Sequence, residues 1–131
     1  MMNFLLVCNE ADSLIQLETG LTKNANCHAT RATSGDEALL KVTDKSASFD
    51  LVIVDSVVDQ APGKTWVEKI IGANAMINTA LVSVLSDEDF HEETEGLGIL
   101  MRIPPNSDES FAEKVIERLS KLLSLYQPIG S

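Results

Sequence analysis

Short apolar runs alternate with amphipathic stretches five times along the chain. Most of these runs are apolar on both faces, which is typical of strands buried in a parallel sheet. The run at 27–32 is instead polar and alternating, which is typical of a strand at a sheet edge. The predicted strands are 4–8, 27–32, 51–55, 80–85 and 99–103.

An amphipathic segment follows each predicted strand. The first helix has Asp12 or Ser13 as its N-cap and carries Leu14, Leu17 and Leu21 on one face. Further helices are predicted at 36–42, 65–71 and 87–95. The last helix has the clearest apolar stripe, formed by Phe111, Val115, Leu119, Leu122 and Leu123.

This alternation predicts a single α/β fold. Parallel strands joined by helices form a doubly wound sheet with helices on both faces. With 27–32 at an edge, a flavodoxin-like five-stranded sheet of order 2-1-3-4-5 fits best. A binding site is then expected where the first and third strands end, around residues 8–10 and Asp55.

Composition narrows the class of protein. The chain has 131 residues, of which 20 are acidic and 10 basic, and its formal net charge is −10. This balance argues against direct binding to nucleic acid or to an anionic membrane. No apolar run is long enough to span a membrane, the start does not resemble a signal peptide, and the two cysteines suit a reducing cytoplasm. Residues 1–125 are expected to form the domain and 126–131 to fray.

The segment around Asp55 carries a more specific pattern. Residues 49–58 contain a strongly apolar strand that ends at Asp55, and Pro62-Gly63 follows at the start of a helix. Together with 34–39 after the second strand and a proline after the fifth, this order resembles the receiver domains of bacterial two-component response regulators. The resemblance implies a cytoplasmic signalling domain rather than an enzyme. It also implies that Asp55 is the phosphoacceptor, with a histidine kinase or phosphotransfer protein as partner.

The resemblance also assigns roles to neighbouring positions. Receivers hold Mg²⁺ with acidic residues after the first strand, the acceptor aspartate and a backbone carbonyl two residues beyond it. Here the acidic pair falls on Cys8 and Asn9, with Glu10 next along, and the carbonyl is that of Val57. The hydroxyl that bonds the phosphate falls on Ser86, or one residue earlier on Leu85. Because Mg²⁺ prefers carboxylate oxygen, weak or absent Mg²⁺ binding is expected.

Two positions after the fourth strand depart from the receiver pattern. Ile103 replaces the phosphate-pairing lysine, and strand alternation points its neighbour Arg102 to the opposite face. Leu100 replaces the aromatic switch residue. The resemblance further implies a cis bond between Ile103 and Pro104.

Two functional hypotheses remain open. The chain is either a phosphoacceptor receiver or a pseudo-receiver that acts as a phosphorylation-independent interaction module. In both, a downstream partner or a second copy binds the face formed by the fourth helix, fifth strand and last helix. A small flavodoxin-like enzyme or nucleotide binder fits poorly, because residues 9–12 contain no phosphate-binding glycine.

Overall fold

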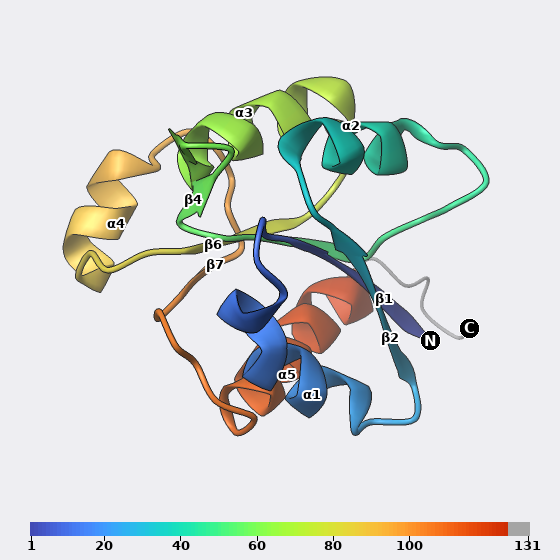
Figure 1. Cartoon of the computed structure of the whole chain (residues 1–131). Helices are drawn as coiled ribbons and strands as arrows, with labels where there is room; N and C mark the ends of the chain where they lie inside the picture. Colours follow the sequence, from blue (N-terminus) through green and yellow to red (C-terminus); the bar gives the residue numbers. More distant parts are fainter. Residues whose placement is uncertain (126–131) are drawn as a thin grey trace.

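The computed structural model describes residues 1–125 and has strands joined mostly by helices (Figure 1). Residues 126–131, and with them the expectation of a frayed tail, lie outside the described residues. The strands are β1 (Met2–Val7), β2 (Cys27–Ala32), β3 (Leu51–Val54), β4 (Val57–Val58), β5 (Ala61–Pro62), β6 (Thr79–Val82) and β7 (Met101–Ile103). The helices are the 3-10 turn η1 (Ala11–Leu14), α1 (Ile15–Thr22), α2 (Gly35–Thr43), α3 (Gly63–Ala73), α4 (Asp87–Glu93) and α5 (Phe111–Leu125).

Five strands form one parallel sheet of order β2-β1-β3-β6-β7. This is the predicted order 2-1-3-4-5, because β4 and β5 form a separate antiparallel hairpin. Phe4 pairs with Leu51 and Val7 with Val54, so the first and third predicted strands are adjacent as expected. All four residues are fully buried.

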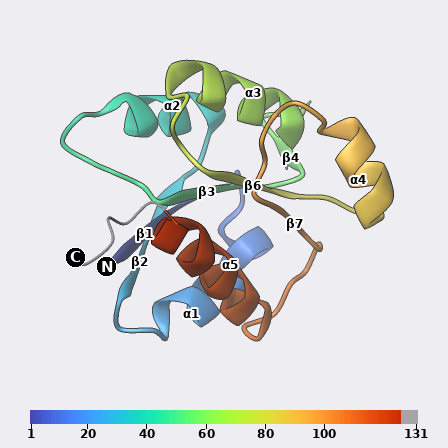
Figure 2. The ribbon, with the colours of Figure 1, turned by 180° about the vertical axis from the view of Figure 1, so that it is seen from behind.

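Helices cover both faces of this sheet (Figures 1 and 2). Phe4 and Leu6 of β1 pack in one core cluster with apolar residues of α1 and α5. Leu5 and Val7 point the other way, into a cluster with apolar residues of α2, α3 and α4. The alternation of side chains along a strand thus produces two cores from one apolar run.

Local hydrogen bonds fix where two of the helices begin. The Ser34 hydroxyl accepts from the Glu37 N–H and caps α2, and the Ser86 hydroxyl accepts from the Asp89 N–H and caps α4. Both are the short-range contacts that satisfy free N–H groups at a helix start. None of the helices among residues 1–125 has the length and apolar character needed to cross a bilayer.

The structure corrects several predicted boundaries. The strand predicted at 80–85 ends at Val82, since the Ser83 hydroxyl accepts from the Leu85 N–H and turns the chain. The helix predicted at 87–95 ends at Glu93, and α3 begins two residues earlier than predicted, at Gly63. The hairpin of β4 and β5 was not predicted.

Candidate functional site

Asp55 lies at the carboxyl end of β3, at the predicted crevice. Its backbone N–H donates to the Val7 carbonyl at 2.9 Å, which fixes it beside the end of β1. The half-buried side chain accepts a hydrogen bond at Oδ1 from the Ser56 N–H at 2.8 Å. An open cavity of about 370 Å³ lies against it, lined by Asn9, Glu10, Ser13, Asp55, Ser56, Val57, Val82, Pro105 and Asn106.

The chain turns tightly after Asp55. The Gly63 N–H donates to the Ser56 carbonyl at 2.8 Å, closing the loop that carries the β4–β5 hairpin. A Cβ atom at Gly63 would lie 2.1 Å from the Asp55 carbonyl oxygen, so this close approach requires glycine. Gly63 therefore positions the backbone of Asp55 against the start of α3.

The side chain of Asn9 is hydrogen-bonded to Asp59, which lies 50 residues further along the chain. Its Nδ2 donates to the Asp59 carboxylate at 2.7 Å, and its Oδ1 accepts from the Asp59 N–H at 2.6 Å. Asp59 also accepts from the Gly35 N–H at 2.8 Å. These hydrogen bonds, first that from Gly35 and then that from Asn9, hold the pKa of Asp59 below its usual value. Asn9 thus ties the β4–β5 hairpin to the end of β1.

The remaining predicted ligands lie in different places. Glu10 and Val57 are exposed and line the cavity of Asp55. Ser86 is not among the residues that line it; it caps α4 instead. The expectation that Ser86 shares a pocket with Asp55 is therefore wrong. Because β6 ends at Val82, the first hydroxyl after this strand belongs to Ser83, which the apolar pattern of the sequence did not indicate.

Position 103 supplies no cation to the site. Ile103 is fully buried in the core cluster on the α1 and α5 side. The bond between Ile103 and Pro104 is trans, which corrects the expected cis form. Arg102 points to the other face, where its guanidinium donates to Asp87 at 2.8 Å and to the Ser83 carbonyl at 3.0 Å.

The donor set around Asp55 offers Mg²⁺ fewer carboxylates than the receiver pattern implies. Mg²⁺ demands near-ideal octahedral geometry and is usually held by one or two carboxylates together with several waters. Only Asp55 and Glu10 contribute carboxylates to the cavity, and the Asn9 amide oxygen already accepts from Asp59. Among residues 1–125, no group of three or more His, Cys, Asp or Glu side chains is arranged to hold a metal ion.

Cys8 is the buried neighbour of this site. Burial, and secondarily the negative charge of Asp55, raise the pKa of its thiol above the ordinary 9.0. The unfolded chain ionises first, so this group contributes stability below pH 9 that is lost as the pH rises above 9. Because burial also raises the pKa of Cys27, the wild type is the reference, and the alkaline fall in unfolding free energy should be shallower in Cys8→Ala than in the wild type. Urea titrations between pH 7 and pH 10 measure the two slopes, and equal slopes would contradict the assignment.

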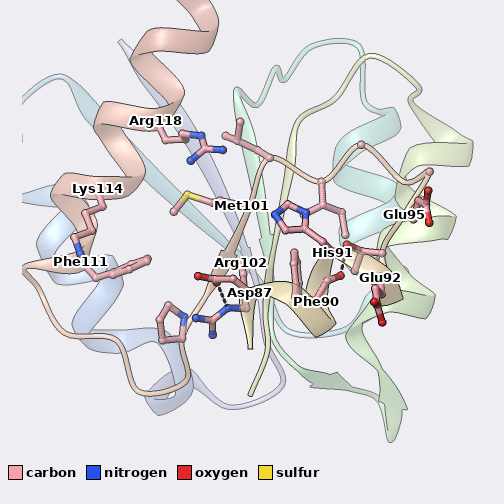
Figure 3. Close-up of a pocket in the computed structure, with 16 residues that line it drawn as sticks. Asp87, Phe90, His91, Glu92, Glu95, Met101, Arg102, Phe111, Lys114 and Arg118 are labelled. Carbon is pink, nitrogen blue, oxygen red and sulfur yellow. Dashed lines mark hydrogen bonds and ion pairs between the residues drawn. The ribbon is translucent and has the colours of Figure 1, made fainter. Parts of the chain in front are cut away.

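A larger cavity, of about 840 Å³, lies between α4, β7 and α5. Figure 3 shows Lys114 and Arg118 of α5 on one side of it and Glu92 and Glu95 on the other. Phe90, Leu100, Met101 and Phe111 add apolar surface. The face expected to bind a partner is thus hollowed and carries charges of both signs.

Comparisons with known proteins agree with this fold. No protein-family model and no curated protein matches the sequence. Solved structures do match. A response regulator receiver domain from Methanospirillum hungatei JF-1 has a TM-score of 0.77 and 17% identity, and the match covers 95% of this chain and 98% of that one. CheY4 of Vibrio cholerae has a TM-score of 0.75 and 18% identity, and the match covers 91% of this chain and 98% of CheY4. TrrA of Thermotoga maritima, in complex with Mg²⁺-BeF, has a TM-score of 0.72 and 19% identity, and the match covers 91% of this chain and 99% of TrrA.

These similarities extend over nearly the whole length of each chain. The resemblance to receiver domains is therefore confirmed at the level of the fold, which is the CheY-like, flavodoxin-like arrangement. The chain shares the scaffold of these domains, and its sequence differs from the receiver pattern at Cys8, Asn9, Ile103 and Leu100.

Proposed function

We propose that this chain is a receiver-type signalling domain that acts through protein–protein contact, with little dependence on phosphorylation of Asp55. The observation that carries the proposal is the charge of the Asp55 cavity. Its lining contains two carboxylates and no basic side chain. A receiver scaffold without local neutralising groups is suited to a constitutive interaction module.

An aspartyl phosphate at position 55 would lack neutralising partners. Phosphorylation adds nearly two negative charges to a protein already at −10. Each missing opposite charge at about 4 Å is worth about 4 kcal/mol at an effective dielectric of 20, before solvation offsets much of it. Ile103 provides no such charge, and Arg102 is held by Asp87 on the other face. The phosphorylated state would therefore gain few contacts that the unphosphorylated state lacks.

The partner face in this proposal is the α4–β7–α5 cavity. Its size, apolar floor and two charged walls suit a protein segment or a second copy rather than a small substrate. Leu100 lies in this lining where receivers carry their switch aromatic. An aliphatic side chain there offers no phenol to swing between buried and exposed positions, which supports a face that is permanently competent.

A second candidate is the phosphoacceptor receiver, with a histidine kinase or phosphotransfer protein as phosphate donor. Its specific support is the half-buried Asp55 carboxylate at the rim of an open cavity, with Glu10 beside it. The similar protein TrrA forms a complex with Mg²⁺-BeF on the same fold. In this chain, Glu10 would have to supply the charge that Asn9 lacks.

Beryllofluoride separates the two candidates. We expect beryllofluoride with Mg²⁺ to leave the amide NMR spectrum of α4, β7 and α5 essentially unchanged. Incubation with acetyl phosphate and Mg²⁺ should add little phosphoryl mass, because the site lacks neutralising groups. Asp55→Asn is the matched control, and TrrA is the positive control for the Mg²⁺-BeF conditions. Stoichiometric phosphorylation and large shifts on this face, both absent from Asp55→Asn, would overturn the proposal.

A further inference from the structure

A second, apolar groove lies on the other side of α4, away from the α4–β7–α5 face. It has a volume of about 600 Å³ and runs between the start of α3, the loop after β6 and α4. Its apolar lining comes mainly from Val57, Pro62, Val84, Leu85 and Phe90. The groove adjoins the Asp55 cavity, with which it shares Ser56, Val57 and Val82.

The exposed apolar side chains of the molecule concentrate here. Seven large apolar side chains are exposed among residues 1–125, and three of them line this groove. Val84 is 82% exposed, Val57 56% and Leu85 36%. A contiguous apolar surface with a polar rim is typical of a site that binds another protein.

Side-chain hydrogen bonds fix the turns that carry these exposed side chains. The Ser83 hydroxyl accepts from the Leu85 N–H at 3.1 Å, and the Ser86 hydroxyl caps α4 immediately afterwards. Val57 lies on the β4–β5 hairpin, which Asn9 ties to the sheet through Asp59. The apolar residues therefore stand on turns fixed by side-chain hydrogen bonds, a preorganisation that lowers the entropic cost of binding.

The rim of the groove determines the charge of its occupant. Glu68 and Glu93 stand on it with one cation, Lys64, which pairs with Glu93 at 3.3 Å. The adjoining helix α4 carries five carboxylates in seven residues. A second copy docking by the same face would bring these acidic rims together. A basic segment would instead be attracted to them.

We propose that this groove binds an amphipathic segment of a partner protein. The apolar side chains of that segment would pack against Val57, Val84 and Leu85, and its flanking Lys or Arg side chains would pair with Glu68 and Glu93 on the rim. The groove is distinct from the α4–β7–α5 face. Binding here does not rest on how Asp55 behaves, and its test uses different variants from the test of the proposed function.

Three synthetic helical peptides test this assignment. The first has leucines at i, i+3, i+4 and i+7 with lysines elsewhere; the second replaces its lysines by glutamate, and the third replaces its leucines by serine. In NMR titrations at moderate salt, the Lys-Leu peptide should bind most tightly and shift the amides of Val57, Val84 and Leu85. The other two peptides should each bind about tenfold more weakly.

Exposed apolar positions supply matched protein variants. Val84→Ser should weaken binding of the Lys-Leu peptide about tenfold, whereas Leu40→Ser, at a 73% exposed position on α2 outside the groove, should leave it unchanged. Because both residues are exposed, both variants should keep the wild-type melting temperature. Equal binding of the Lys and Glu peptides, equal effects of the two variants, or shifts mapped to α4–β7–α5 would each overturn the proposal. Self-association of the protein that Val84→Ser abolishes would overturn it as well.

Discussion

Replacing Gly63 with alanine is expected to lower the free energy of unfolding by about 2–3 kcal/mol. The added Cβ would lie 2.1 Å from the Asp55 carbonyl oxygen and 2.8 Å from Leu81 Cδ1. The oxygen belongs to the backbone at the end of the central strand, which cannot yield without moving Asp55. For a chain of this length the melting temperature should fall by roughly 10 °C, as measured by circular dichroism.

Gly72 provides the control within the same helix. Apart from Gly72 itself, its two chain neighbours and the adjacent backbone of its own helix, no atom lies within 4 Å of a Cβ built at this position, and Gly72 sits near the end of α3. Gly72→Ala should therefore raise stability, by about 0.5–1 kcal/mol, because alanine has the better helix propensity. If both variants changed stability in the same direction and by similar amounts, the close contact at Gly63 would not be what fixes the loop after Asp55.

The fold could be predicted because its strands are distinct in the sequence. Residues 4–8 and 51–54 are apolar on both faces, which is typical of strands in the middle of a parallel sheet. The polar run 27–32 is an edge strand with one buried residue, Ala32. Once the edge was identified, right-handed crossovers left few orders, and the observed sheet has the predicted one.

Boundaries after β6 could not be predicted from the same pattern. Val84 and Leu85 extend the apolar run of 80–82, so they were assigned to the strand, whereas the structure exposes both. Hydrophobicity does not distinguish an apolar residue in a core from one on a binding surface. Because the strand was predicted to extend to residue 85, the phosphate-bonding hydroxyl was expected at Ser86. The residue that directly follows the strand is Ser83.

The site around Asp55 depends on contacts that are remote in sequence. Asn9 is predicted from the sequence as a metal-site residue, but its two hydrogen bonds to Asp59 span 50 residues and leave no local signal. The hairpin that carries Asp59 turns through two non-glycine residues with positive φ, Asp59 and Gln60. Left-handed backbone at such residues is uncommon, so propensity alone does not predict this turn.

Trp66 links this hairpin to the second core layer. Its indole N–H donates to the Val58 carbonyl at 2.8 Å, and its ring lies where a Cβ atom of Gly35 would have to be. Lys69 Nζ stands 4.5 Å from the ring centroid. One side chain on α3 therefore contacts both the hairpin beside Asp55 and the start of α2, which explains how a loop of few residues is held in place.

Trp66→Ala is accordingly expected to cost about 3–5 kcal/mol of unfolding free energy, the loss typical of a large buried aromatic side chain. Trp66→Phe keeps most of the packing but leaves the Val58 carbonyl without its donor, so it should cost about 1–3 kcal/mol. Urea unfolding followed by circular dichroism measures both, since Trp66 is the only tryptophan and its fluorescence is lost. The hairpin amides of Val57 to Gln60 should also exchange faster with solvent in both variants than in wild type. A loss below about 1 kcal/mol in Trp66→Ala, with hairpin exchange unchanged, would show that the loop beside Asp55 is held by Asn9 and Asp59 without help from α3.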